Sequence, residues 1–401
     1  MKLASGHLSY CTNIHSGESW KDHFGTLKNN FPNIREEVCR DQPMGIGLRL
    51  SNSASKDLLN EDSLEEFKSW LTDNKAYVFT MNGFPYGDFH HAVVKDMVHA
   101  PDWTSNERVE YTVRLFKILA KLLPAGMEGG ISTSPLSYRF WHPTSGLFQK
   151  AMLTATQNII GLAEELIRIR QNSGIMMHLD VEPEPDGVLE SGAEFIHWFE
   201  NVLIPLAKSI LPGRLQITEN EAEVLVKEHI CLCYDVCHFA IGYESHLEVL
   251  ELLDKSGIRV GKIQISAALK AEMPADVKLR AGIAEAFSIY NESTYLHQVV
   301  ARKEDGDLLR YSDLPGALKD YSNPSVKEWR AHFHVPVFIK NLGMLQSTQT
   351  DIVELLTVQK NKPFTDHMEV ETYTWEVLPD SLKVPIDQSI IRELNWVKQL
   401  M

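Results

Sequence analysis

The sequence predicts an α/β fold, and three observations favour an eight-stranded (β/α)8 TIM barrel. Short apolar, β-prone runs alternate with segments of helical periodicity through the first two-thirds of the chain. With one late run added, there are eight, which is the number of strands that closes such a barrel. The 401 residues exceed the roughly 250 of a simple barrel, so we expect additions to the basic fold.

The runs and the periodic segments define the expected elements. The strands are expected at 7–15, 44–51, 76–82, 130–138, 175–182, 230–235, 261–266 and 367–375. Helices with apolar residues at i, i+3 and i+4 are expected at 63–72, 108–123, 148–170, 193–210 and 246–255. A doubly wound open sheet is the alternative, but the Gly-x-Gly-x-x-Gly fingerprint of such sheets is missing after the first strand.

The alternation breaks between residues 291 and 365, where 295–301 and 329–338 resemble strands that flank a polar loop. The sequence contains no repeat or linker that marks a second independent domain. We therefore expect a single elaborated barrel over residues 1–401, with 291–365 as an insertion before the last barrel strand.

The insertion has three open roles: a lid over the barrel, a donor of ligands to it, or an arm of a homo-oligomer. An arm would expose an apolar strand, and Val335, Val337 and Phe338 suit such a strand. The sequence does not choose among these roles.

Composition restricts the partners and the compartment. A formal net charge of -15 argues against a broad nucleic-acid surface, because phosphate binding needs clustered Lys and Arg. The start of the chain lacks an apolar signal core and no stretch reaches about eighteen uninterrupted apolar residues, so we expect no membrane insertion. The odd set of five cysteines indicates reduced thiols, which predicts a cytoplasmic protein.

The most informative motif is Ile230-Cys-Leu-Cys-Tyr-Asp-Val-Cys-His238, a predicted buried strand that ends in an acid, with a histidine three residues further on. Cys231, Cys233 and Asp235 share one face of this strand. A carboxylate and an imidazole that converge at a strand end can hold Mn²⁺, Zn²⁺, Fe²⁺ or Mg²⁺. The alternative is that Asp235 is a helix N-cap, and we expect the cysteines to be core residues rather than thiolate ligands.

Two further strands end in carboxylates. One face of the fifth strand carries His178, Asp180 and Glu182. Glu182 comes last, before a proline, and an acid that ends an apolar strand is costly without a function. Glu184 and Asp186 in the following loop are expected to face water. In the last strand Glu369 and Glu371 share a face, so Glu371 is the matching carboxylate at the strand end.

Histidine and asparagine side chains complete the candidate site. His332 and His334 alternate with an aromatic residue and so point to one side, which indicates a metal or acid/base site. The alternative is that both are hydrogen-bonded residues on an exposed strand. The first strand adds Asn13 and His15, and the third adds Asn82. Chemistry in such barrels lies at the C-terminal ends of the strands, where these residues collect.

Together these motifs resemble the xylose isomerase-like barrels, a superfamily of sugar isomerases, ketose 3-epimerases, inosose dehydratases and endonuclease IV. Within it the chain is most similar to EboE-type proteins, a branch named for metabolite traffic. That similarity rests on Gly6-His-Leu-Ser-Tyr-Cys-Thr-Asn-Ile-His15-x-Gly-Glu-Ser-Trp20, Cys-Tyr-Asp-Val-Cys-His238, Ala-His-Phe-His-Val-Pro336 and Glu-Thr-Tyr-Thr-Trp375. The resemblance covers nearly the whole chain.

In the epimerase-like members of the superfamily, Glu, Asp, His and Glu from the fifth to eighth strands hold one divalent ion. By this resemblance Glu182, Asp235 and Glu371 fill three of the four places. His238 matches a substrate-binding histidine of these members. The resemblance thus implies a site for Mn²⁺, Zn²⁺ or Mg²⁺ at the ends of the barrel strands.

The seventh strand departs from the family pattern, because Gln264 stands where a metal-binding histidine is expected. Either Gln264 ligates through its carbonyl oxygen, or His334 or His332 of the insertion restores an imidazole. The expected metal ligands are therefore Glu182, Asp235, Gln264, His334 and Glu371. The residues expected to bind substrate are Asn13, His15, Asn82, His238 and His332.

The resemblance implies a metal-dependent isomerase or epimerase that acts on a polyhydroxylated carbonyl metabolite, a sugar or a related small molecule. Glu182 and Glu371 would serve as base and acid on opposite faces of the substrate. Because of Gln264, a non-catalytic metabolite-binding or traffic protein is the alternative. A metal-dependent phosphoesterase is a third hypothesis, and the acidic charge balance argues against it.

Overall fold

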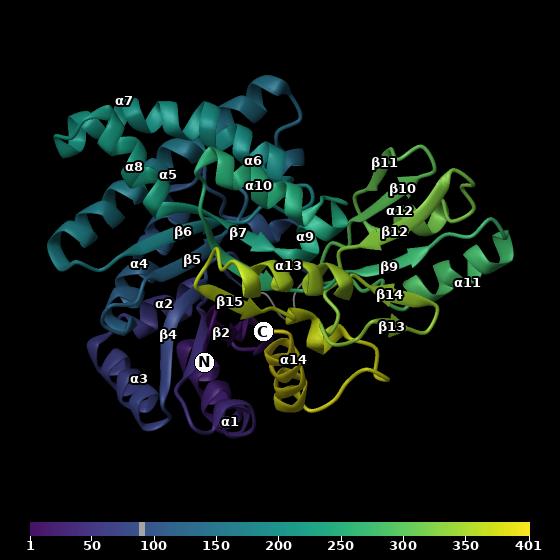
Figure 1. Cartoon of the computed structure of the whole chain (residues 1–401), viewed down its shortest axis with the longest axis horizontal. Coiled ribbons are helices and arrows are strands. Elements are labelled where there is room, and N and C mark those ends of the chain that lie inside the picture. The colour runs from purple at the N-terminus through teal and green to yellow at the C-terminus, as the bar shows by residue number, and fades with distance from the viewer. Residues whose placement is uncertain (88–92) are drawn as a thin grey trace.

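The computed structural model describes residues 1–87 and 93–401. Within these residues eight parallel strands form one nearly closed barrel (Figure 1). In spatial order they are β2 (Gly6–Tyr10), β15 (His367–Val370), β8 (Val260–Ile265), β7 (Ile230–Asp235), β6 (Met177–Val181), β5 (Gly129–Thr133), β4 (Ala76–Asn82) and β3 (Met44–Arg49). A short strand, β1 (Lys2–Leu3), pairs antiparallel with β2, and a parallel bridge between Cys11 and Gly47 joins the two sides of the barrel. The predicted TIM barrel is confirmed.

The barrel strands are buried on both faces. Every residue of β3, β5, β6, β7, β8 and β15 is buried. One face of each strand meets the surrounding helices and the other fills the barrel, as is usual in parallel sheets. The expected strands 130–138 and 367–375 are too long, because the chain leaves the sheet after Thr133 and Val370.

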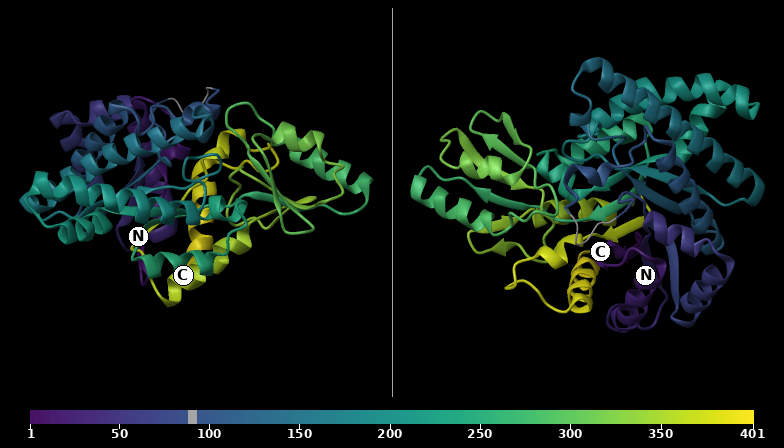
Figure 2. Two further views of the ribbon diagram at one scale, coloured as in Figure 1. Left: turned by 90° about the horizontal axis from the view of Figure 1, so that it is seen from above. Right: turned by 180° about the vertical axis from the view of Figure 1, so that it is seen from behind.

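Helices cover the outside of the barrel (Figure 2). The expected ones are α3 (Glu61–Asp73), α4 (Asn106–Leu122), α5 (Ser145–Ser173), α6 (Gly192–Trp198), α7 (Ile204–Leu215) and α10 (His246–Ser256). Others were not expected: α1 (Trp20–Cys39), α2 (Asn52–Leu58), α8 (Glu219–His229), α13 (Gln349–Asn361) and α14 (Ile386–Leu400). In α1 the pattern is weakened by Gly25 and Pro32, which both lie inside the helix. Among the described residues, no helix is long and apolar enough to cross a membrane.

A second, antiparallel sheet lies beside the barrel (Figures 1 and 2). Its strand order is β11 (Leu308–Tyr311), β10 (Val299–Lys303), β12 (Val326–Ala331), β9 (Leu269–Glu272), β14 (Leu345–Ser347) and β13 (Asn341–Leu342). The same segment contains α11 (Val277–Ser288) and α12 (Leu314–Lys319). It begins directly after β8, earlier than the sequence pattern indicated, because the Ala, Leu, Lys and Glu of β9 favour a helix when read alone.

The segment after β12 leaves the second sheet and returns to the barrel. The expected strand 329–338 ends at Ala331, and Val335 N donates a hydrogen bond to Ala267 O, just beyond β8, at 3.0 Å. Val335 and Val337 are fully buried within the chain. They therefore do not form the exposed apolar strand that an oligomer arm would need.

The middle of the barrel is polar, although branched aliphatic side chains usually fill this space. Lys262 Nζ lies 2.7 Å from Glu369 Oε1, and both side chains are fully buried. Burial opposes the charge of Lys262, but Glu369 beside it raises the pKa of the ammonium group above its ordinary value. Gly47 leaves the room that this pair needs, because a β-carbon there would lie 1.4 Å from Glu369 Oε2.

We expect Gly47→Ala to destabilise the fold by about 1–3 kcal/mol or more, because the new methyl group must displace a buried carboxylate that Lys262 holds. Gly25→Ala is the matched control. It lies inside α1 with nothing within 4 Å of the added β-carbon, so it should be neutral or stabilise by about 0.5–1 kcal/mol. Urea unfolding followed by circular dichroism measures both, and equal effects would contradict the tight fit at Gly47.

Candidate functional site

A pocket opens where the C-terminal ends of the barrel strands meet the second sheet. Its volume is about 70 Å³, which is room for an ion and a few small groups. The barrel side of the pocket is lined by Asn13, Asn82, Glu182, Glu184, His238 and Glu371. The segment that carries the second sheet contributes Tyr295, Leu296, Gln298, His332 and His334. The site is thus shared between the barrel and the inserted segment.

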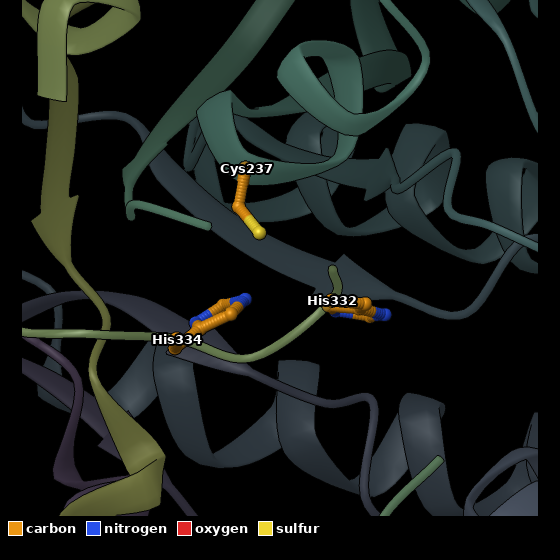
Figure 3. Close-up of side chains that lie close together, drawn as sticks. All are labelled: Cys237, His332 and His334. Atoms are coloured by element: carbon orange, nitrogen blue, oxygen red, sulfur yellow. The ribbon is translucent and has the colours of Figure 1, made fainter. Parts of the chain in front are cut away.

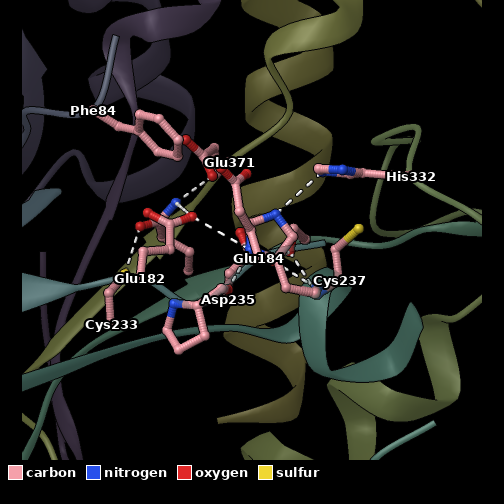
Figure 4. A network of polar contacts seen from close by, with 12 residues as sticks. Phe84, Glu182, Glu184, Cys233, Asp235, Cys237, His332 and Glu371 are labelled. Atoms are coloured by element: carbon pink, nitrogen blue, oxygen red, sulfur yellow. Dashed lines mark hydrogen bonds and ion pairs between the residues drawn. The ribbon is translucent and has the colours of Figure 1, made fainter. Parts of the chain in front are cut away.

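Three buried carboxylates converge at the ends of barrel strands (Figure 4). Glu182 follows β6 directly, Asp235 is the last residue of β7, and Glu371 follows β15. Oxygens of the three lie within 4.8 Å of one another. The N-cap interpretation of Asp235 is confirmed, because its side chain caps the short helix α9 (Val236–Ile241) by accepting a hydrogen bond from His238 N at 3.2 Å. The structure thus brings together the three carboxylates that the sequence singled out.

Glu371 is held by side-chain amides on both of its oxygens. Asn13 Nδ2 and Asn82 Nδ2 each donate to Oε1 at 2.8 Å. Gln264 Nε2 donates to Oε2. These three donors come from different strands or strand ends of the barrel, so together they fix the position of the carboxylate. Because they are neutral amides, they do not neutralise its charge.

Gln264 lies between two of the carboxylates, but it presents its amide nitrogen to them. Besides its bond to Glu371, Gln264 Nε2 lies 3.3 Å from Glu182 Oε1. Its oxygen instead accepts a hydrogen bond from Cys233 Sγ at 2.6 Å. In this orientation Gln264 positions the carboxylates and does not offer an oxygen to a cation, which would require the amide to rotate by half a turn.

The three carboxylates repel one another. Burial, followed by Glu371 and Asp235, raises the pKa of Glu182 well above its usual value. Burial, followed by Asp235 and Glu369, raises the pKa of Glu371 to about 8. Burial acts to raise the pKa of Asp235 too, but His238, His334 and the hydrogen bond from Ser266 Oγ outweigh it and lower the pKa. A dication among these oxygens would favour their charged forms.

Two imidazoles face each other across the pocket. His238 Nδ1 lies 3.0 Å from Pro183 O, and His332 Nδ1 lies 3.0 Å from Gln298 Oε1. Gln298 Nε2 donates to Pro185 O at 3.3 Å, which sets the direction of that amide. Both Nδ1 atoms therefore carry the proton in neutral imidazoles, and the two Nε2 atoms meet at 3.1 Å with lone pairs toward each other. A donor or a cation placed against them relieves this contact.

His334 is oriented as a ligand would be. Its Nδ1 donates to Glu371 O at 3.1 Å, which leaves Nε2 as an acceptor. Nitrogen and oxygen atoms of Asp235, His238 and His334 lie within 4.8 Å of one another. Both predicted histidines of this segment follow β12 rather than lie in it, and Figure 3 shows them together with Cys237 of α9. The expected strand position was wrong, but the side chains still reach the barrel.

Several acceptor atoms of the site lack a partner. Within residues 1–87 and 93–401, Glu182 Oε2, Asp235 Oδ2 and His334 Nε2 are buried without a hydrogen-bond donor. Buried acceptors without donors are rare and require a ligand, a water molecule or an ion. Two carboxylate oxygens and one imidazole nitrogen are typical ligands of Zn²⁺ or Mn²⁺. The residues present therefore fit a divalent cation.

One expected substrate contact is not at the pocket. His15 is fully buried, and its Nε2 lies 3.2 Å from Tyr10 Oη while its ring packs near His23. The 3-10 turn Thr12–Ile14 points Asn13 into the pocket and turns the chain before the next residues. Side chains alternate between two faces only along a continuous strand, and this turn ends the strand. Asn13 and His15 therefore do not share a face, although the sequence pattern predicted that they would.

Glu184 and Asp186 were expected to face water, and this expectation was wrong. Both are buried, and Glu184 lines the pocket with its Oε1 3.1 Å from His99 Nε2. Burial lowers the pKa of His99 to about 3, so its imidazole is neutral. The prolines on both sides of Glu184 suggested an exposed loop, but the segment is covered by the inserted sheet and by the residues around His99.

Comparisons with known proteins identify the fold. No protein-family model and no curated protein matches the sequence. Among solved structures, a xylose isomerase-like TIM barrel protein from Mycobacterium smegmatis in complex with magnesium matches with a TM-score of 0.51 and 9% identity, over 100% of this chain and 98% of that one. At this identity the match shows the fold alone, and the chain has the xylose isomerase-like TIM barrel fold.

Two further structures match less closely. A D-tagatose 3-epimerase-like protein has a TM-score of 0.48 at 11% identity, over 98% of this chain and 96% of that chain. The IOLI protein with a binding zinc atom has a TM-score of 0.46 at 11% identity, with the same coverage of 98% and 96%.

The raised pKa of Glu371 predicts how stability depends on pH. Because the folded protein holds this proton more tightly than the unfolded chain, the chelator-treated protein should be most stable below pH 4.5 with respect to this group. Stability should fall as the pH rises toward 8. Glu371→Gln should remove at least about 1 kcal/mol of this dependence, as urea unfolding at a series of pH values measures. A slope that Glu371→Gln leaves unchanged would contradict the repulsion among the carboxylates.

Proposed function

We propose that this protein is a metal-dependent isomerase or epimerase that acts on a polyhydroxylated carbonyl metabolite. The observation that carries the proposal is the convergence of three buried carboxylates with unpartnered acceptor atoms at the C-terminal end of the barrel. Structural carboxylates rarely gather in this way without a cation, because each desolvated charge is costly. The fold also places its chemistry at this end of the barrel.

Glu182, Asp235, Glu371 and His334 are the residues that would hold the ion. When bound there, a divalent cation would polarise the carbonyl group of the substrate and make the adjacent C–H more acidic. Gln264 contributes by holding Glu182 and Glu371 in place through its amide nitrogen. In this role it is a positioning residue and not one of the four ligands.

Glu182 and Glu371 would exchange protons with the substrate. Glu182 would accept the proton as a base through one of its carboxylate oxygens. Glu371 is the matching carboxylate of the same group, and it would return the proton to the substrate as an acid. The two residues follow β6 and β15, which are separated in the barrel sheet by β7 and β8. This separation suits action on opposite faces of a substrate carbon.

The rest of the pocket supports a ligand that carries hydroxyl groups. The facing Nε2 atoms of His238 and His332 require a hydrogen-bond donor, and a substrate hydroxyl supplies one. Asn82 lines the same pocket, and Phe84 adds an apolar wall. A ring or chain with both polar edges and C–H faces, such as a sugar, has this combination of surfaces.

A non-catalytic metabolite-binding or traffic protein is the second candidate function. The orientation of the Gln264 amide favours it, since a ligand position is given up in this barrel. The EboE-type resemblance of the sequence agrees with either function. All five cysteines are buried and free, which supports the expected cytoplasmic location.

The first test is metal content and turnover. We expect the wild-type protein, reconstituted with Mn²⁺ or Zn²⁺, to bind a cation that Glu182→Ala and Glu371→Ala both lose, as measured by elemental mass spectrometry. Candidate ketoses and aldoses are then incubated in D2O, because carboxylate-mediated isomerisation exchanges the α-proton, which proton NMR detects. Glu371→Gln should reduce this exchange by about 100-fold or more while keeping the fold.

Glu200→Gln is the matched control, since Glu200 is an exposed carboxylate on the outer helices. It should leave metal content and proton exchange unchanged. Binding of a sugar without any exchange, at full metal occupancy, would reject the isomerase and favour the binding protein. A wild-type protein that takes up no cation at the carboxylates would reject the metal-dependent isomerase and favour the binding protein.

A further inference from the structure

A second group of metal-ligand side chains lies deeper in the barrel, toward the N-terminal ends of the strands. His178 and Asp180 belong to β6, where Asp180 is two residues before Glu182, and Cys231 is the second residue of β7. One ligand atom from each lies within 4.8 Å of the others, and all three side chains are buried. His367, four residues before Glu371 on β15, is about 13 Å from the carboxylate site along the strand. The Lys262–Glu369 pair lies between the two groups.

The hydrogen bonds of this group leave acceptors without donors. His178 Nδ1 lies 2.6 Å from Asp180 Oδ1, an arrangement in which a carboxylate orients a ligand histidine. His367 Nε2 donates to Glu128 O at 3.2 Å, so its Nδ1 is an acceptor. In the described part of the chain, Asp180 Oδ2 and His367 Nδ1 are both buried without a hydrogen-bond partner.

Two glycines, Gly130 of β5 and Gly261 of β8, make room for these side chains. The point where a β-carbon of Gly130 would stand lies 2.7 Å from Asp180 Oδ2 and 2.9 Å from His367 Nδ1. The corresponding point at Gly261 lies 1.8 Å from Asp180 Oδ1. Any larger residue at either position would displace the group. The two unpartnered acceptors, Asp180 Oδ2 and His367 Nδ1, therefore border one hollow. This hollow is open because residue 130 is a glycine.

The group is reached from outside through a separate pocket. This pocket has a volume of about 180 Å³ and is lined by His178, His367, Gly261, Thr365 and Asp366, among others. Glu128 and Arg259 form an ion pair at its edge, with Arg259 Nη2 2.7 Å from Glu128 Oε2. An ion thus has an entry path that does not pass through the carboxylate site.

We propose that His178, Asp180 and Cys231 form a second metal site, specific for Zn²⁺, with His367 as its fourth donor. Two nitrogens, one oxygen and one sulfur make a donor set typical of a closed zinc site. On binding, the Cys231 thiol loses its proton to solvent as the Zn–S bond forms, and the two anionic ligands balance the charge of the ion. An ion here cross-links β6, β7 and β15, so its role is structural. The proposal does not depend on the function of the carboxylate site.

Cobalt substitution separates the two sites. Full-length protein is stripped with a chelator and titrated with Co²⁺, and a thiolate-to-cobalt charge-transfer band is followed in the near ultraviolet. We expect Cys231→Ser to lose the band and one equivalent of bound Zn²⁺. Cys237→Ser is the matched control, because Cys237 borders the other site, and it should keep the band. Asp235→Asn should lose metal only at the carboxylate site and keep the band as well.

Other results would overturn the proposal. A band that survives in Cys231→Ser or disappears in Cys237→Ser would place the thiolate ligand elsewhere. A wild-type protein without any thiolate band would mean that the hollow holds only water. If Cys231→Ser fails to fold by circular dichroism, Cys231→Ala, which keeps a small apolar side chain, gives the same comparison.

Discussion

The rest of the structure depends on one buried ion pair, Lys262 with Glu369, in the polar interior of the barrel. Neither side chain of this ion pair is exposed. Gly47 leaves the space that the Glu369 carboxylate occupies, because it has no β-carbon. Breaking such a pair leaves an uncompensated buried charge, which is strongly destabilising. The pair also divides the interior into two polar regions. One lies toward the C-terminal ends of the strands and carries a surplus of carboxylates, and the other lies toward the N-terminal ends and carries imidazoles, a thiol and the single carboxylate of Asp180.

The surplus of carboxylates explains why the region at the C-terminal ends of the strands suits a cation. Burial and mutual repulsion raise the pKa of Glu182 and Glu371, and amide donors rather than cations surround Glu371. Amide groups hold a carboxylate in place without neutralising it. The barrel thus holds the Glu371 carboxylate in position without a cationic side chain bonded to it.

The sequence predicted the barrel and its carboxylates because both follow from local periodicity. Eight apolar runs define the strands, and alternation along a strand places Glu182, Asp235 and Glu371 toward the interior. Properties that depend on distant contacts were not predictable. Glu184 is buried against residues far along the chain, such as His99, and β9 is a strand because β12 and β14 pair with it. The position of His15 was missed because a single turn ends the alternation.

The pocket is built from two parts of the chain, the barrel and the segment that carries the second sheet. The carboxylates belong to the barrel, while His332, His334 and Gln298 arrive on a segment whose strands pair among themselves. The two parts are nevertheless coupled, because His334 Nδ1 donates a hydrogen bond to Glu371 O at 3.1 Å. The pocket is therefore complete only when the inserted segment has docked on the barrel.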